Sequence, residues 1–262
     1  MSKRVFLGFI IAFLVIGAVV SAGCTGTPNN EQKIYVVGID DYKPYSYNDA
    51  DGNITGFDVE CMKWIANNAG YNVTFKFIDW DAIAIYLNTG KCDIICSGLS
   101  ITDERKNEMD FSNPYWSISI GVVGLADSKA TMDDFYAGNL KIGVQRGCSA
   151  DKGLKSWLGE ELYNKMMKEE KIINRYENFA FSMMDLKNKR VDVVIFDEAA
   201  IQSQMADNTC EFKLIGTVKE TDEKFAAAVK KGNSELLKIL NEGYAKLMVT
   251  EDWSKLIEKY EL

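Results

Sequence analysis

Apolar and polar residues alternate in blocks along the chain, and the first series of blocks begins at Ile34. The runs IYVVGI, VTFKFI and DIICSG are short, apolar and rich in β-branched residues, which predicts strands. The segments between them, from about Asp58 to Ala69 and from about Trp80 to Asn88, have the apolar spacing of helices. This order predicts an α/β unit with mainly parallel strands.

A second series of the same kind follows Ser128. Strands are expected at KIGVQ, KIINRY and VDVVIF, and helices from about Ala150 to Lys168 and from about Asn178 to Asn188. The chain therefore has two α/β units of similar size. The stretch between them, Trp116 to Leu125 (WSISIGVVGL), is too rich in Gly and β-branched residues for a helix, so we expect a strand that links two lobes.

The last segment resumes with FAAAV and two amphipathic helical patterns, which we expect to pack on the first unit. The chain then crosses between the lobes twice, near residues 118 to 124 and near 219 to 225. Two crossings form a hinge with a cleft beneath it. The predicted first lobe is 33–119 plus 224–262, and the predicted second lobe is 120–223, including the hinge segments.

The N-terminus has the pattern of an export signal. Lys3 and Arg4 precede an apolar run that ends in Ser21-Ala22-Gly23-Cys24, which predicts a signal peptide over residues 1–23 and a polar tether over 24–32. The ending resembles the lipobox of bacterial and archaeal lipoproteins, in which the cysteine receives a lipid, although Ser21 departs from the usual apolar residue. An uncleaved anchor helix is the alternative, and both interpretations place the remaining chain outside the cell, on the outer face of the membrane.

Composition excludes several classes of function. The chain has 30 basic and 38 acidic residues, and removal of residues 1–23 takes away only Lys3 and Arg4, which leaves a formal charge of −10. Nucleic acid and anionic lipid surfaces are therefore not expected partners. The chain has no histidine and no glycine-rich nucleotide loop, so we expect no metal, no cofactor and no catalytic residue.

Five cysteines follow Cys24, and an odd number leaves at least one unpaired. A disulfide and a role as small buried apolar residues both stay open, with the second favoured. These cysteines are Cys61, Cys92, Cys96, Cys148 and Cys210.

The run from Cys96 to Arg105 (CSGLSITDER) turns from a strand end into a helix start. Gly98 lets a ligand approach the backbone, and Ser100 offers a hydroxyl and an N–H. Arg105 opposes the positive end of the helix dipole unless an anion lies nearby. A guanidinium beside free backbone N–H groups makes a carboxylate site. A solvated Arg105 that pairs with Asp103 or Glu104 is the alternative.

Four motifs, in order, resemble the polar amino acid family of ABC-transporter solute-binding proteins (family 3), which includes glutamine-binding and lysine/arginine/ornithine-binding members. The resemblance covers nearly all of the mature chain and implies a two-lobed periplasmic-binding-protein-like fold of type II, with two hinge strands. The motifs are Gly56-Phe57-Asp58-Val59, Ser100-Ile101-Thr102-Asp103-Glu104-Arg105, Met109-Asp110-Phe111-Ser112 with Pro114-Tyr115, and Lys231-Gly232-Asn233.

The resemblance implies how the backbone groups of an amino acid would be held. Arg105 matches the arginine that pairs with the ligand carboxylate, assisted by the N–H of Ser100 and of the Gly147-Cys148-Ser149 turn. Asp197 matches the acid that accepts the ligand ammonium, together with the Ser100 hydroxyl and the Gly98 carbonyl. Capping of the following helix is the structural alternative for Asp197. A nucleophilic Cys148 is disfavoured because the chain has no histidine to activate it.

The resemblance also implies the contacts of the ligand side chain. Tyr42 and Trp80 match two aromatics that sandwich it, and Asp40 matches an acid that reaches polar or cationic groups. An acid with two aromatics suits a cation, so we rank a basic amino acid first and glutamine or another polar one second. Further specificity residues are Ser97, Gln145 and Phe196, with Arg146 within reach.

The implied function is the extracellular substrate-binding component of an ABC transporter that captures a free amino acid for import. Its implied partners are that amino acid, a permease and its ATPase, and the membrane through the lipid on Cys24. A fold-related dehydratase acting on a small cyclic acid is one alternative, and a ligand-sensing domain is another. A dehydratase would need a general acid in the cleft and would leave Asp197 unexplained.

Overall fold

The computed structural model describes residues 32–168, 172–207, 211–219 and 221–262. The predicted signal peptide, Cys24, the tether up to residue 31 and Cys210 lie outside the described residues. Within the described part, no helix is long and apolar enough to cross a membrane.

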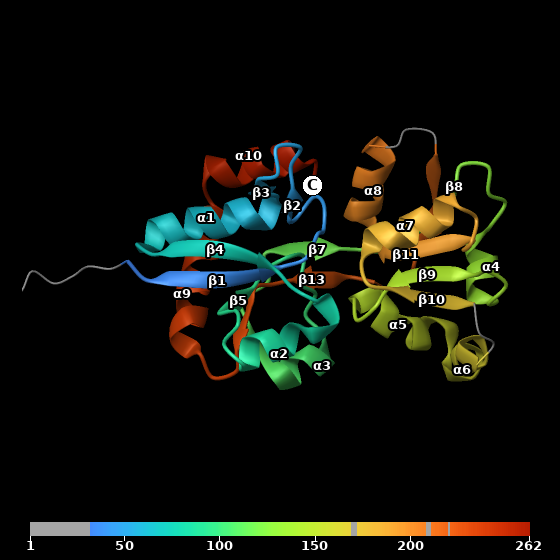
Figure 1. The fold of residues 1–262 in the computed structure, drawn as a ribbon, viewed down its shortest axis with the longest axis horizontal. Coiled ribbons are helices and arrows are strands. Elements are labelled where there is room, and N and C mark those ends of the chain that lie inside the picture. The colour runs from blue at the N-terminus through green and yellow to red at the C-terminus, as the bar shows by residue number, and fades with distance from the viewer. Residues whose placement is uncertain (1–31, 169–171, 208–210, 220) are drawn as a thin grey trace, which may run out of the picture. The chain divides into compact units, whose positions relative to one another are not determined.

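The first lobe is built on a five-stranded sheet in the order β4-β1-β5-β14-β6 (Figure 1). β1 runs parallel to β4 and β5, whereas β14 runs antiparallel to β5 and β6. Val37, Ile94 and Ile95 of this sheet are fully buried, so the sheet carries the core of the lobe. The strands are β1 (Ile34–Ile39), β4 (Asn72–Phe77), β5 (Ile94–Ile95), β6 (Met109–Phe111) and β14 (Ala228–Lys230).

Helices from both ends of the described chain pack together in this lobe. Phe57 of α1 lies 5.1 Å from Trp253 of α10, measured between ring centroids, and α1 also packs on α9 at Ile65 and Gly243. The last two helices therefore pack on the helix α1 of the first lobe. These elements are α1 (Phe57–Ala69), η1 (Trp80–Ala82), α2 (Ile83–Asn88), α3 (Asp103–Glu108), α9 (Ser234–Leu247), α10 (Glu251–Tyr260) and the hairpin β2 (Tyr47–Asn48) with β3 (Ile54–Thr55).

The second lobe is built on a sheet in the order β10-β9-β11-β8-β12 (Figure 1). Here β9 runs parallel to β10 and β11, and β8 runs antiparallel to β11 and β12. The elements are β8 (Ile120–Leu125), α4 (Met132–Tyr136), β9 (Ile142–Gln145), α5 (Ser149–Leu158), α6 (Glu160–Lys168), β10 (Ile173–Tyr176), α7 (Phe179–Lys187), β11 (Val193–Asp197), α8 (Glu198–Asp207) and β12 (Phe212–Thr217).

Two short strands carry the chain between the sheets. β7 (Trp116–Ile118) pairs with β13 (Glu223–Phe225) in an antiparallel ribbon, with Glu223 opposite Ile118. Beyond the ribbon, the Ile120 N–H donates to the Thr221 hydroxyl at 3.1 Å, so the outgoing and returning segments lie side by side. The fold is a two-lobed α/β fold with a double crossing.

The structure corrects several expected elements. The linking strand expected over Trp116 to Leu125 is divided at Ser119 between the ribbon and the second sheet. The helix expected from Ala150 to Lys168 is broken at Gly159, whose φ of 81° and ψ of 149° are not helical. The strands are also less parallel than expected, because β8 and β14 join their sheets from the crossings and run antiparallel to their neighbours.

The described cysteines are buried. Cys61, Cys92, Cys96 and Cys148 are unpaired, so no disulfide joins any two of these four. The Cys96 sulfur lies 3.3 Å from the Tyr244 hydroxyl inside the first lobe. These cysteines fill the core, in agreement with the favoured interpretation.

Candidate functional site

The loop between β5 and α3 presents the first part of the site. Gly98 has a φ of 57°, and a Cβ placed there would lie 2.4 Å from Cε1 of Tyr42, so only glycine fits. The Gly98 N–H donates to Oδ2 of Asp58 at 2.6 Å, and the Thr102 hydroxyl accepts from the Arg105 N–H at 3.2 Å as the helix cap. The loop is therefore fixed at both ends.

Arg105 is buried, with only 2% of its surface exposed. Its Nη1 donates to the Ser100 carbonyl at 2.8 Å, and its Nη2 donates to the Gly147 carbonyl of the other lobe at 3.0 Å. The carbon of the guanidinium lies 5.8 Å from the centroid of the Trp80 ring, and Nε has no hydrogen-bond partner among the described residues. Burial lowers the pKa of Arg105.

The alternative of a solvated Arg105 is wrong. Asp103 pairs instead with Lys106 at 2.9 Å, and Glu104 pairs with Lys152 of the second lobe at 2.7 Å. No carboxylate in the described part of the chain forms an ion pair with Arg105. A buried cation without a counter-ion has a large desolvation cost, so this position suits an incoming anion.

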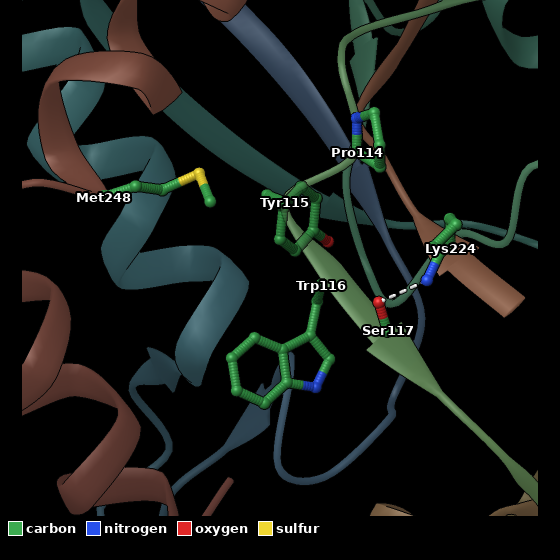
Figure 2. Close-up of a pocket in the computed structure, with 6 residues that line it drawn as sticks. All are labelled: Pro114, Tyr115, Trp116, Ser117, Lys224 and Met248. Atoms are coloured by element: carbon green, nitrogen blue, oxygen red, sulfur yellow. Dashed lines mark hydrogen bonds between the residues drawn. The ribbon is translucent and has the colours of Figure 1, made fainter. Parts of the chain in front are cut away.

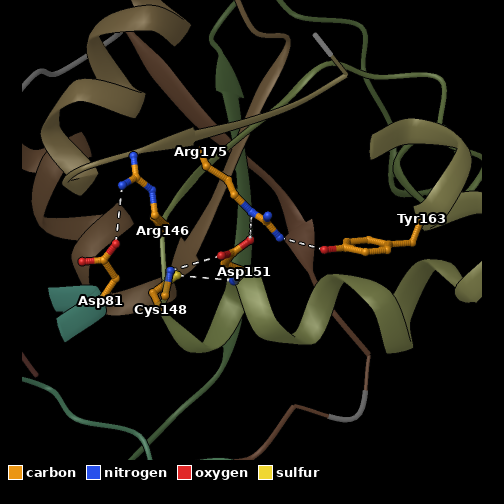
Figure 3. A network of polar contacts seen from close by, with 7 residues as sticks. Asp81, Arg146, Cys148, Asp151, Tyr163 and Arg175 are labelled. Carbon is orange, nitrogen blue, oxygen red and sulfur yellow. Dashed lines mark hydrogen bonds and ion pairs between the residues drawn. The ribbon is translucent and has the colours of Figure 1, made fainter. Parts of the chain in front are cut away.

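The Gly147 turn, between β9 and α5, faces Arg105 from the second lobe. A network of polar contacts holds it (Figure 3): Asp151 accepts from the Gly147 N–H at 3.1 Å and from Nε of Arg175 at 2.6 Å. Of the turn that was expected to offer N–H groups to an anion, the Gly147 N–H is therefore already bonded to Asp151. Cys148 caps α5 through its sulfur, and burial raises its thiol pKa to about 12, so it is not a nucleophile at neutral pH.

Asp197 ends β11 and is 5% exposed. Its carboxylate accepts a hydrogen bond from the Tyr42 hydroxyl of the first lobe, so the side chain points toward the other lobe rather than only capping α8. Burial raises its pKa well above the ordinary value, and the charge of Glu223 adds to this effect. A cation near Asp197 would therefore stabilise its charged form.

Asp40 follows β1 and meets the second lobe through Gln145. Nε2 of Gln145 donates to Oδ2 of Asp40 at 2.5 Å, and the Asp40 N–H donates to the Ser97 hydroxyl at 3.0 Å. Burial raises the pKa of Asp40 to about 6, despite the hydrogen bond from Gln145, which lowers it. The structure thus brings these three predicted residues together.

The predicted aromatic residues separate into two groups. Tyr42 packs edge-on against Phe196 at 5.1 Å between ring centroids, and Phe196 stacks on Phe179 at 4.2 Å. Trp80, by contrast, lies beside Arg105. The two rings predicted to sandwich a ligand side chain therefore contact different predicted residues, Phe196 and Arg105.

The sequence reasoning assigned no role to three buried or half-buried acids, Asp58, Asp151 and Glu223. Asp58 belongs to the first of the four family motifs. Its carboxylate accepts from the Gly98 N–H and from the Tyr115 hydroxyl, and burial raises its pKa to about 6. Oε2 of Glu223 accepts from the Ser100 hydroxyl at 2.6 Å, and Ser100 lies 3.4 Å from the Ser149 hydroxyl. No sequence pattern marks Asp151 or Glu223.

Two cavities differ in their relation to these residues. One of about 350 Å³ lies between the lobes and is lined by Trp80, Arg105, Gly147 and Lys152, among others. A larger one of about 410 Å³ lies on the hinge ribbon beside Trp116, Lys224 and Met248 (Figure 2). The smaller cavity matters here because it contains the unpaired cation.

A sequence model of the bacterial extracellular solute-binding proteins, family 3, matches residues 35–262. The chain belongs to this family. The family consists of binding proteins, so the dehydratase alternative is not supported, and the family resemblance of the four motifs is confirmed.

Individual relatives agree with the family and the fold. A probable histidine-binding protein of Neisseria gonorrhoeae is 30% identical over 261 residues, which cover 96% of this chain and 94% of that protein. An ancestral arginine-binding protein bound to arginine is 30% identical with a TM-score of 0.78, over 87% of this chain and 98% of that chain. A Streptococcus pneumoniae ABC-uptake substrate-binding protein with bound histidine is 26% identical with a TM-score of 0.78, over 87% and 92%.

Proposed function

We propose that this family 3 protein captures a free amino acid between its lobes and passes it to a membrane permease powered by a separate ATPase. One observation carries the proposal. The guanidinium of Arg105 is buried, has no carboxylate partner in the described part of the chain, and is bonded to carbonyls of both lobes.

Arg105 is suited to the ligand carboxylate. A guanidinium binds a carboxylate through two parallel N–H bonds, and such a pair is stronger than its bonds to neutral carbonyls. The ligand carboxylate would replace the Gly147 carbonyl and supply the missing negative charge. The Ser100 carbonyl can keep its bond to Nη1, which holds the guanidinium in place.

Asp197 is suited to the ligand ammonium. Burial raises its pKa and so disfavours the charged form, and an ammonium nearby would stabilise that form. Arg105 and Asp197 then divide the two charges of one zwitterion. A plain carboxylic acid would leave Asp197 without a cationic partner.

Asp40, Gln145, Ser97 and Phe196 are suited to the side chain, and a basic side chain fits best. Asp40 offers a carboxylate, and Trp80 and Tyr42 offer aromatic faces for a cation. The histidine-binding and arginine-binding relatives support this preference. Glutamine or another polar amino acid is the second choice, because Gln145 can exchange hydrogen bonds with an amide.

The N-terminal pattern supports an extracytoplasmic location, with the chain held at the outer face of the membrane through lipid on Cys24. The family description, extracellular solute-binding, agrees with export. Mass-spectrometric analysis of the membrane-bound protein tests the anchor: a lipid-modified N-terminal Cys24 is expected, and an intact Met1 would contradict it.

A thermal-shift screen of the twenty amino acids and ornithine tests the function. A ligand that binds only the native state raises the melting temperature by mass action. We expect arginine, lysine, ornithine or histidine to raise it most. No shift with any of these compounds would contradict the proposal.

A further inference from the structure

Glu223 lies on the returning hinge strand β13, close to the predicted ammonium site. Its Oε2 accepts the Ser100 hydroxyl at 2.6 Å, and Ser100 is 2% exposed. Backbone bonds fix the two segments side by side: the Ile101 N–H donates to the Lys224 carbonyl at 2.9 Å, and the Ala226 N–H donates to the Leu99 carbonyl at 3.0 Å. The contact is therefore held on both sides by the backbone.

The contact determines how the Ser100 hydroxyl can bind a ligand. A serine hydroxyl has one proton to donate and two lone pairs to accept, whereas a carboxylate can only accept. The short, charge-assisted bond to Glu223 uses that proton in preference to the Ser149 hydroxyl, which lies 3.4 Å away. Only the lone pairs of Ser100 remain for a ligand.

An ammonium can donate to those lone pairs, but a carboxylate, a methylene or an aldehyde oxygen cannot. We propose that Glu223 is a positioning residue that holds the Ser100 hydroxyl as an acceptor and makes the cleft select the α-ammonium of its ligand. This inference rests on the proposed amino acid function, and it adds a selectivity residue to the site. Glu223 acts through Ser100 and need not touch the ligand.

Electrostatics supports the same assignment. Besides the larger effect of burial, the charge of Glu223 adds to the raised pKa of Asp197 and partly offsets the lowered pKa of Arg105, so its field reaches both predicted ligand-binding groups. A negative field at this point favours a cation and disfavours an anion. Glu223 thus adds to the preference for the ammonium end of the ligand.

The test compares L-arginine with 5-guanidinopentanoate, which is the same molecule without the α-ammonium. Glu223→Gln keeps the size but removes the charge, and its amide can donate to Ser100 and release the serine proton. We expect the arginine Kd to rise about tenfold, with little change for the deamino compound. The ratio of the Kd of the deamino compound to the Kd of arginine should then fall about tenfold. Isothermal titration calorimetry, by competition where binding is weak, measures both.

The matched control is Asp222→Asn, which alters the neighbouring acid of the same segment. Asp222 is 75% exposed and pairs with Lys224, so the ratio should not change. Ser100→Ala gives a second route: it should lower the ratio by itself, and Glu223→Gln should have no further effect in that background. This double-mutant comparison does not depend on the stability of one variant.

The outcomes separate this inference from the proposed function. If Glu223→Gln weakens both compounds equally, or leaves the ratio unchanged while wild-type protein binds arginine, Glu223 is only structural and the inference is overturned. If wild-type protein binds neither compound, the proposed preference for a basic amino acid fails as well.

Discussion

At the scale of single residues, burial sets the charge of the acids around the cleft. It is the largest cause of the raised pKa values of Asp40, Asp58 and Asp197. Each of these acids therefore has a protonation state that a nearby cation or a change of pH can alter. The charge of the empty cleft and the charge of the occupied cleft need not be the same.

Asp40 predicts a pH-dependent preference for a cationic side chain. Its pKa is raised to about 6, so it is charged above that pH and neutral below it. The ratio of the affinities for arginine and citrulline, which lacks the side-chain charge, should fall as pH drops through 6, by at most about tenfold per pH unit. Titration calorimetry at several pH values measures the ratio, in which effects common to both ligands cancel.

Two variants serve as controls for the Asp40 prediction. Asp40→Asn should make the arginine-to-citrulline ratio small and independent of pH. Asp41→Asn removes the neighbouring exposed charge, which contributes to the raised pKa of Asp40, so the dependence should persist with its midpoint at a lower pH. A ratio that stays constant with pH in wild-type protein would exclude Asp40 from the side-chain site.

The close approach of Tyr42 to Gly98 predicts that a side chain at position 98 clashes with Tyr42, in addition to straining the backbone. Gly98→Ala and Gly52→Ala both place alanine at positive φ, 57° and 83°, but only at Gly98 does a Cβ meet another residue, Tyr42. Gly52→Ala should cost about 1 kcal/mol of unfolding free energy, and Gly98→Ala should cost more and weaken ligand binding. Urea unfolding and calorimetry measure the two effects; equal losses in both variants would contradict the close approach of Tyr42.

At the scale of elements, the sequence predicted most strands and helices but not the contacts that fix the turns between them. Hydrophobic periodicity predicted β1, β9, β11 and most helices, because each buries a regular set of apolar residues. It did not predict the break at Gly159 or the division at Ser119, which depend on backbone angles and on pairing with β13. Asp151 was missed because its partners, Gly147 and Arg175, are brought to it only by the fold.

The contacts of Asp151 predict that its substitution lowers the unfolding free energy of the protein. Asp151→Asn removes the carboxylate partner of Arg175, which keeps only the Tyr163 hydroxyl, and weakens the bond to Gly147. The unfolding free energy should fall by about 2–3 kcal/mol, less than for a fully buried pair because Arg175 is one-third exposed. Ligand affinity should fall too. Urea unfolding measures the loss, and Glu160→Gln, which alters an exposed pair with Lys155, is the control expected to cause little loss. Equal small losses would contradict the role given to Asp151.

At the scale of the whole molecule, the predicted site is assembled from both lobes. Arg105 and Gly147, Asp40 and Gln145, and Tyr42 and Asp197 each join one lobe to the other. Two series of α/β elements predicted the two lobes, and the family motifs predicted the residues, but neither predicted which side chains pair across the cleft. Those pairings depend on the relative position of segments far apart in the chain, and the exact residue limits of the lobes stay a prediction.

These bonds across the cleft explain how a ligand would favour closure. A ligand that contacts Arg105 in one lobe and Asp197 in the other binds the closed form more tightly than the open form, so it shifts the population toward closure. Arg105 is central because it already contacts both lobes.

Titration of the protein and its Arg105→Lys variant with L-arginine by calorimetry is the most direct test of this account. Lysine keeps the charge but cannot form two parallel N–H bonds to a carboxylate, so the affinity for L-arginine should fall by roughly a hundredfold. The control is Arg190→Lys, at an exposed pair with Asp185, which should leave that affinity unchanged. An unchanged affinity for L-arginine in the Arg105→Lys variant would contradict the central claim that Arg105 holds the ligand carboxylate.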